Sequence, residues 1–140
     1  MKKLFILALM SLATASISAQ KIKLKKGNVE LDGKVIMTFE KEVWGVHKIH
    51  LYDLSTEDEL IEINNNDNET SNYFDDDFVQ IRFLTTGDLV EMKMNKPFKK
   101  IIEWMIKKKV ITEEGAVDTD KLELFVKNYD ENITNRTVRY

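Results

Sequence analysis

Hydrophobic and polar residues alternate with a period of two along much of this chain, in the stretches 22–25, 28–31, 35–40, 78–85 and 88–94. Side chains two residues apart point to the same face of a β-strand, so each stretch predicts a strand with one buried face. The last two stretches place six apolar residues on one side of a sheet. These six residues are Val79, Ile81, Phe83, Val90, Met92 and Met94.

Further features between these stretches complete the predicted sheet. Asp32-Gly33 favours a two-residue hairpin loop, because both positions tolerate positive φ. Residues 44–54 are apolar on both faces, which predicts a longer strand that is central in the sheet or covered on both sides. A turn at 55–58 and a short strand at 59–64 follow. Residues 64–77 are polar, acidic and without periodicity, so they predict an exposed loop.

Beyond residue 97 the hydrophobic period becomes helical, and two amphipathic helices are predicted, joined by a connector at 110–117. Asn95 is suited to cap the first helix with Pro97 in its first turn, and Asp118 or Thr119 is suited to cap the second. The apolar stripes are Phe98, Ile101, Ile102 and Met105 in the first helix, and Leu122, Phe125, Val126 and Tyr129 in the second.

Segregated strands followed by helices indicate the α+β class. We expect an antiparallel β-meander of about six or seven strands, with two C-terminal amphipathic helices packed on it. Residues 20–132 would form one domain, and 133–140 a polar C-terminal tail that is loose or adds a short edge strand.

The first nineteen residues are typical of a secretory signal peptide. Lys2 and Lys3 precede an apolar run at 4–12, and small residues dominate 13–19. The apolar run is too short to cross a bilayer, so we expect no stable membrane insertion after cleavage. Cleavage is expected after Ala19, with Ser18 as the alternative. These features favour a periplasmic or secreted bacterial protein.

Removal of this signal would leave about 120 residues, which suits one domain with a real core. The chain has no cysteine, which excludes disulfides, thiolate metal sites and a lipid anchor on cysteine. In signal and composition it resembles the small exported proteins of Gram-negative bacteria with AT-rich genomes. That resemblance is limited to the signal and the composition, and it implies no activity.

The charges are unevenly distributed along the chain. Without Lys2 and Lys3 there would be 19 basic and 24 acidic residues, a net charge of −5, which opposes binding to nucleic acid or anionic membranes. Residues 53–91 hold twelve acidic residues and one basic residue, whereas 92–110 hold seven lysines and one acidic residue. Two interpretations follow: the acidic stretch meets a basic protein partner, or the two stretches neutralise each other within the molecule.

Candidate metal ligands are few. His47 and His50 are the only histidines, and residues three apart on a strand face opposite ways, so they cannot bind one ion together. We expect one to be half-buried and the other exposed, rather than a catalytic or ligating histidine.

A calcium loop is the second metal hypothesis. Asn64, Asn66 and Asn68 have the alternating spacing of such a loop, with Asp67 and the acidic run 75–77 nearby. However, Glu69 stands where the loop needs glycine, so a solvated acidic loop is the favoured interpretation. We expect no metal and no cofactor.

Catalytic motifs are also scarce. The mature chain has only Ser55 and Ser71, neither in a nucleophile elbow, and it has no glycine-rich phosphate loop. Glu57 with Glu59 is a carboxylate pair of the kind that glycosidases use, but such pairs arise by chance in an acidic chain. The sequence therefore favours a protein that is not an enzyme.

Two functional hypotheses remain. The first is an exported interaction protein, inhibitor- or immunity-like, with residues 53–91 as its contact face. Trp104 lies off its helix stripe beside lysines, so it either anchors a partner or widens the buried face. The candidate partner contacts are Asp67, Glu69, Asp75, Asp76, Asp77 and Trp104. The second hypothesis is a carrier of a small apolar ligand, in a pocket between sheet and helices lined by the six apolar strand residues named first.

Overall fold

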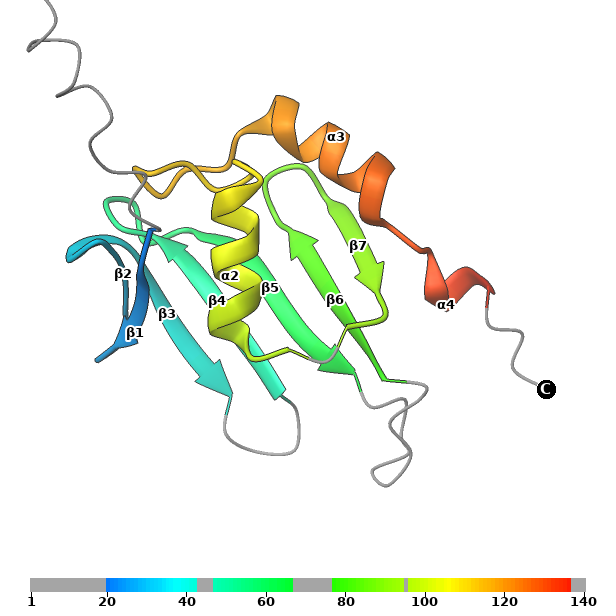
Figure 1. Ribbon diagram of the computed structural model, residues 1–140, viewed down its shortest axis with the longest axis horizontal. Helices are drawn as coiled ribbons and strands as arrows, with labels where there is room; N and C mark the ends of the chain where they lie inside the picture. The colour runs from blue at the N-terminus through cyan, green and yellow to red at the C-terminus, as the bar shows by residue number, and fades with distance from the viewer. Residues whose placement is uncertain (1–19, 43–46, 67–76, 95, 137–140) are drawn as a thin grey trace, which may run out of the picture.

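The computed structural model describes residues 20–42, 47–66, 77–94 and 96–136, and the predicted signal peptide, residues 1–19, lies outside them. Within the described residues, seven strands form one antiparallel sheet in chain order (Figure 1), which confirms the predicted meander. The strands are β1 (Ile22–Lys25), β2 (Asn28–Leu31), β3 (Lys34–Glu42), β4 (His47–Asp53), β5 (Glu59–Asn66), β6 (Phe78–Phe83) and β7 (Asp88–Met92).

The turn between β2 and β3 is the predicted hairpin. Asp32 and Gly33 have φ values of +50° and +84°, which is the left-handed region that this two-residue turn requires. Asp32 also accepts a hydrogen bond from the backbone N–H of Lys21 through Oδ1 at 2.8 Å. The turn therefore fixes the register of β2 against β3 and holds the start of β1.

The sheet has an apolar inner face and a polar outer face. Strand pairing aligns the inner-face residues of β4 to β7 across the sheet. Nine of these residues are buried: Ile49, Leu51, Ile61, Ile63, Val79, Ile81, Phe83, Val90 and Met92. The outer face includes Thr38, Glu40, Glu42, Lys48, His50, Tyr52, Glu59, Glu62, Asn64, Asn66, Gln80, Arg82 and Glu91. Strand β4 is central, which is the first of the two predicted alternatives; the second does not hold, because His50 and Tyr52 remain partly exposed on the outer face.

Strand β3 departs from simple alternation. The pairing of β2 with β3 shifts so that Val29 opposes Met37 and Glu30 opposes Val35, which leaves Ile36 as an extra residue. Such a β-bulge lets two consecutive side chains face the same side. Ile36 and Met37 are consequently both buried, whereas Val35 is only half-buried.

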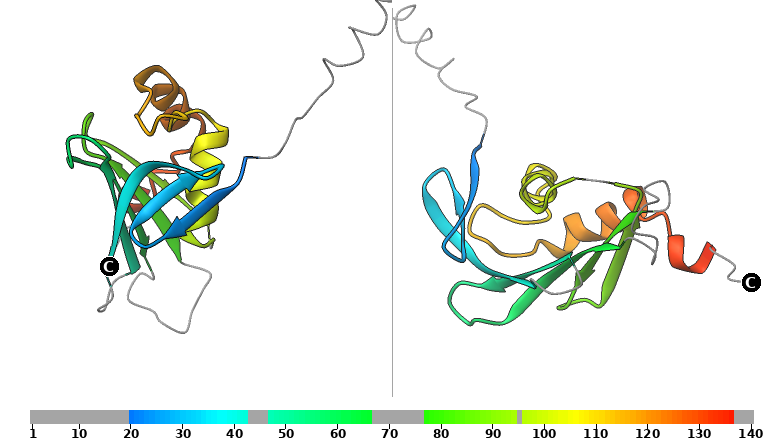
Figure 2. Two further views of the ribbon diagram at one scale, coloured as in Figure 1. Left: turned by 90° about the vertical axis from the view of Figure 1, so that its left-hand side faces the viewer. Right: turned by 90° about the horizontal axis from the view of Figure 1, so that it is seen from below.

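Helices α2 (Phe98–Lys107) and α3 (Thr119–Tyr129) follow the sheet, in agreement with the predicted class. The sheet curves around α2, and α2 and α3 lie on its concave, inner side (Figure 2). The buried residues of α2 include the predicted Ile101, Ile102 and Met105, which join the core of the sheet. None of the helices in the described residues has the length and apolarity needed to cross a membrane.

The helix starts differ in how they are capped. Pro97 occupies the cap position of α2 rather than its first turn, and no side chain of the described residues caps that helix. Asn95, the predicted cap, lies outside them. Asp118 caps α3, because its side chain accepts a hydrogen bond from the backbone N–H of Lys121 at 3.1 Å. The prediction for the second helix is thus confirmed, and that for Pro97 is wrong by one position.

The connector between the two helices packs tightly against β3. Ile111 and Val117 form an antiparallel bridge, and Gly115 turns the chain between them with a φ of +85°. A Cβ atom at Gly115 would lie 2.0 Å from the backbone O of Ile36. Only glycine permits this approach, so the connector and the bulge of β3 are fitted to each other.

The chain after α3 returns to the sheet and covers the edge of β7. Of the predicted loose tail or edge strand at 133–140, the part that the structure describes is instead a short helix, α4 (Ile133–Arg136), which lies beyond β7 (Figure 2), and residues 137–140 lie outside the described residues. The backbone N–H groups of Glu91 and Lys93 donate to Asp130 Oδ1 at 3.0 Å and to Glu131 Oε2 at 2.6 Å. Two acidic side chains therefore replace the neighbouring strand that the edge of β7 lacks.

Hydrogen bonds to Asp53 in the turn after β4 should make part of the stability of the fold depend on pH in the acidic range. The backbone N–H of Thr56 and the hydroxyl and backbone N–H of Ser55 donate to Asp53 Oδ1, which lowers the pKa of Asp53 to about 2. Because the folded pKa is depressed, this contribution to stability is present above the ordinary value of 3.8 and is lost as the pH falls toward about 2. An NMR titration of the carboxyl group checks this, and a midpoint near 3.8 would contradict it.

Candidate functional site

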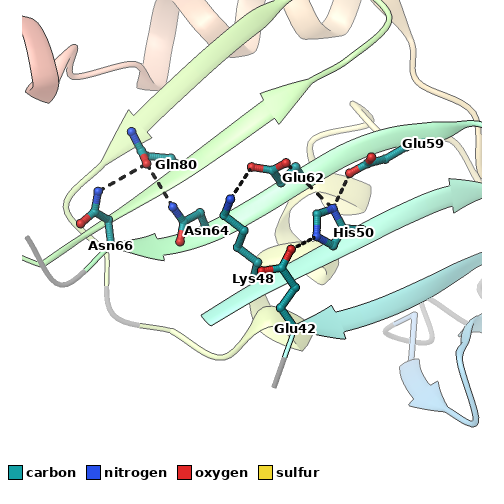
Figure 3. Close-up of polar contacts among 8 residues, drawn as sticks. All are labelled: Glu42, Lys48, His50, Glu59, Glu62, Asn64, Asn66 and Gln80. Carbon is teal, nitrogen blue, oxygen red and sulfur yellow. Dashed lines mark hydrogen bonds and ion pairs between the residues drawn. The ribbon is translucent and has the colours of Figure 1, made fainter. Parts of the chain in front are cut away.

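The outer face of the sheet carries the densest group of chemically active side chains in the described residues. It gathers carboxylates, amides, a lysine and a histidine from four neighbouring strands (Figure 3). Because α2 and α3 lie on the other side, they leave this face uncovered along β3, β4 and β5. The outer face is therefore the part of the sheet that is open to a ligand or a partner.

His50 is the centre of this group. Its Nδ1 lies 2.5 Å from Glu59 Oε1 and 3.9 Å from Glu62 Oε2, and its Nε2 lies 2.9 Å from Glu42 Oε1. Lys48 Nζ forms an ion pair with Glu62 Oε1 at 3.5 Å. The side chain of His50 is only 15% exposed, so these contacts lie close to the sheet surface rather than in bulk solvent. We call Glu42, His50, Glu59 and Glu62 the His50 cluster.

A second β-bulge brings Glu59 into the His50 cluster. Leu51 pairs with Ile61, but Tyr52 pairs with Glu59, so Leu60 is the extra residue on β5. Without the bulge Glu59 would share a face with Ile61, on the inner side. The bulge turns it to the outer face beside Glu62, which is a common role of bulges next to functional sites.

The electrostatic environment favours the charged form of His50. Burial alone would lower the pKa of His50, but hydrogen bonds to Glu59 and Glu42 and the charge of Glu62 outweigh it, so the pKa is raised above 6.5. Burial and the nearby charge of Glu40 likewise raise the pKa of Tyr52 above 10.0. The shift of His50, which runs against the effect of burial, marks its surroundings as a region of negative potential.

The sequence analysis missed the His50 cluster. The prediction of one half-buried and one exposed histidine is confirmed, since His50 is half-buried and His47 is exposed, but the sequence paired Glu59 with Glu57. Glu57 lies in the turn before β5 with a φ of +62°, whereas Glu59 bonds His50. The hairpin register that places Leu51 opposite Ile61 also places His50 opposite Glu62, so that pairing was accessible from the turn length.

The candidate partner contacts fall in different places. Asp67, Glu69, Asp75 and Asp76 lie outside the described residues, as do Asn68 and Ser71 of the other hypotheses. Asp77 is half-buried just before β6. Asn66, predicted in the loop, and Asn64, predicted where strand and loop meet, both belong to β5. Their side-chain amides both donate to Gln80 Oε1 on the outer face (Figure 3).

Trp104 lies between the two long helices. Its ring centroid is 4.9 Å from that of Phe125 and 4.8 Å from that of Tyr129, and Phe125 in turn contacts Phe83 of the sheet. The indole is partly exposed and packs against the core. It therefore contributes to the joint between α2 and α3.

The residues expected to line an apolar pocket belong to the filled interior. Val79, Ile81, Phe83, Val90 and Met92 are buried in the core cluster, and Met94 packs against it at partial exposure. An open groove of about 900 Å³ lies elsewhere, between α2, the connector and Ile22. Lysines and acidic residues both line it, and none of the six predicted residues does.

Comparison with known proteins adds no assignment to these observations. No family model matches the chain, and neither a curated protein nor a solved structure matches it significantly. The functional argument therefore depends on the geometry and charge of the described residues.

Proposed function

We propose that this chain is a small exported, non-enzymatic binding protein that recognises a partner with a basic surface. The contact face is the outer face of the sheet together with the acidic stretch 53–91, in the manner of an inhibitor or immunity protein. Export follows from the interpretation of residues 1–19 as a signal peptide.

The separation of charge across the sheet is the observation that carries this proposal. The lysines of α2 lie on the inner side of the sheet, whereas Glu40, Glu42 and Glu62 lie on the outer face. Across residues 20–42, 47–66, 77–94 and 96–136, no ion pair joins a lysine of α2 to an acidic residue of the strands. Neutralisation within the molecule, the competing interpretation, thus lacks support, and the negative outer face remains available to attract a basic partner.

The arrangement of the hydroxyl and carboxyl groups supports a binding role over catalysis. Ser55 Oγ donates to Asp53 within a turn, at 2.8 Å. Glu59, one member of the carboxylate pair that the sequence offers for hydrolysis, bonds His50 on a convex sheet face rather than lining a cleft. A convex, charged surface is suited to contact another macromolecule.

The proposal is tested by capturing the partner with the wild-type domain and then measuring association rates at two salt concentrations. The variant with Asp75→Asn, Asp76→Asn and Asp77→Asn should associate about tenfold more slowly at low salt, because electrostatic steering depends on these charges. Its rate should also depend less on salt.

The matched control removes three acidic residues from the helical side, through Glu114→Gln, Asp120→Asn and Glu123→Gln, all of which are exposed. This control should associate at nearly the wild-type rate. Equal slowing of both variants, or no slowing of either, would show that the acidic stretch does not guide the partner.

A further inference from the structure

We propose that the His50 cluster binds one divalent transition-metal ion, with His50, Glu59 and Glu62 as ligands and Glu42 as the residue that orients the imidazole. One ligand atom from each of His50, Glu59 and Glu62 lies within 4.8 Å of the others. This inference goes beyond the proposed partner binding and does not depend on it.

The contacts of His50 require a positive charge inside the cluster. Both ring nitrogens face carboxylate oxygens, Nδ1 at 2.5 Å and Nε2 at 2.9 Å. A neutral imidazole carries only one N–H, so it cannot donate to both Glu59 and Glu42. A second proton between Nδ1 and Glu59 satisfies these contacts as they stand. A metal ion in its place would be bound by Nδ1, Glu59 and Glu62 after the Glu59 carboxylate moves outward, because two ligand atoms about 2.0 Å from one tetrahedral ion lie about 3.3 Å apart.

The local charge balance favours a divalent ion over a proton. Glu42, Glu59 and Glu62 contribute three negative charges, and among the described residues the only cation in ion-pair contact with them, apart from the histidine itself, is Lys48. With a neutral imidazole the cluster holds an excess of two negative charges at its half-buried surface. A proton cancels one of them, whereas a divalent ion cancels both.

The orientation of the imidazole is that of a metal ligand. Nδ1 faces Glu59 and Glu62, while Nε2 faces Glu42 on the other side of the ring (Figure 3). A ligating histidine commonly donates its other N–H to a carboxylate, which fixes the tautomer and raises the basicity of the ligand. Glu42 occupies that position.

The donor set indicates the kind of ion. One imidazole nitrogen and two carboxylates suit zinc or a similar transition metal with water completing the coordination, whereas calcium takes oxygen ligands alone. His50 and Glu62 stand on the central strands β4 and β5 and are paired with a neighbouring strand on both sides, whereas Glu59 pairs only with Tyr52 of β4. The bulge at Leu60 supplies the third ligand.

Titration of zinc chloride into the metal-free full chain at neutral pH tests the site by calorimetry and by thermal unfolding. We expect one ion per chain and a rise in melting temperature, because zinc would bind the folded state preferentially. His50→Gln should remove both effects. Glu42→Gln should weaken zinc binding about 10- to 100-fold, as loss of an orienting carboxylate does.

Two matched controls come from the same strands. His47→Gln removes the exposed histidine of β4, and Glu40→Gln removes the carboxylate that bonds Tyr52 instead of His50. Both should bind zinc like the wild type. Circular dichroism of each metal-free variant establishes that it is folded.

The proposal is overturned if the wild type gives neither a heat of binding nor a thermal shift, or if His50→Gln binds zinc as tightly as the wild type. It is also overturned if NMR shows both ring nitrogens of His50 still protonated in excess zinc, since a proton then supplies the charge. The titration contains no partner protein. Failure of this site is therefore distinguishable from failure of the proposed function.

Discussion

Gly115→Ala is expected to lower the free energy of unfolding by at least about 3 kcal/mol, which is unusually large for the addition of one methyl group. The new Cβ would lie 2.0 Å from the backbone O of Ile36 and 2.8 Å from its carbonyl carbon. Neither atom can move without shifting the bulge of β3, and the φ of +85° is itself unfavourable for alanine. Urea denaturation of the purified domain measures the loss.

Gly33→Ala is the matched control for this prediction. Gly33 has nearly the same φ, +84°, but an added Cβ there meets no atom within 4 Å. Only the conformational cost of about 1 kcal/mol should remain. Similar losses for the two variants would mean that the connector relaxes freely, and that its close approach to β3 does not constrain the fold.

Phe125→Ala is expected to cost about 3–5 kcal/mol, as truncation of a buried aromatic residue usually does. Phe125 is 2% exposed, and its ring contacts Trp104, Tyr129 and Phe83 at centroid distances of 4.9, 5.1 and 6.3 Å. It therefore joins α2, α3 and the sheet at one point. Removal of its ring leaves a cavity, and small movements of the neighbouring aromatic rings cannot fill that cavity.

Leu124→Ala provides the comparison, because Leu124 precedes Phe125 on α3 and is 55% exposed. Its free energy of unfolding should stay within about 0.5 kcal/mol of the wild type. If both substitutions were equally mild, the aromatic cluster would not be what fixes α3 to the rest of the domain.

The strands and helices could be predicted from hydrophobic periodicity wherever that periodicity continues without a β-bulge. Val79, Ile81 and Phe83 alternate without interruption, and the structure buries all three. The change of period at Phe98 likewise predicted the first helix, although the expected caps placed its start slightly before the observed one. These predictions succeed because hydrophobic burial acts on each element separately.

The His50 cluster could not be predicted in the same way, because it depends on an irregularity of pairing. Simple alternation places Glu59 on the inner side, and only the extra residue Leu60 turns it toward His50. Bulges respond to twist and packing across the whole sheet, which no local pattern records. The short α4 was missed for a related reason, since it depends on contacts of Thr134 with the distant Glu91.

The covering of β7 by Asp130 and Glu131 has a consequence for solubility. An incoming extended peptide or a growing fibril needs unsatisfied amides along the rim of a sheet. At Glu91 and Lys93 the protein's own carboxylates already occupy those amides. A truncated chain ending at Tyr129 would lose both carboxylates and present these amides to other molecules, so the last part of the chain acts as a guard against aggregation.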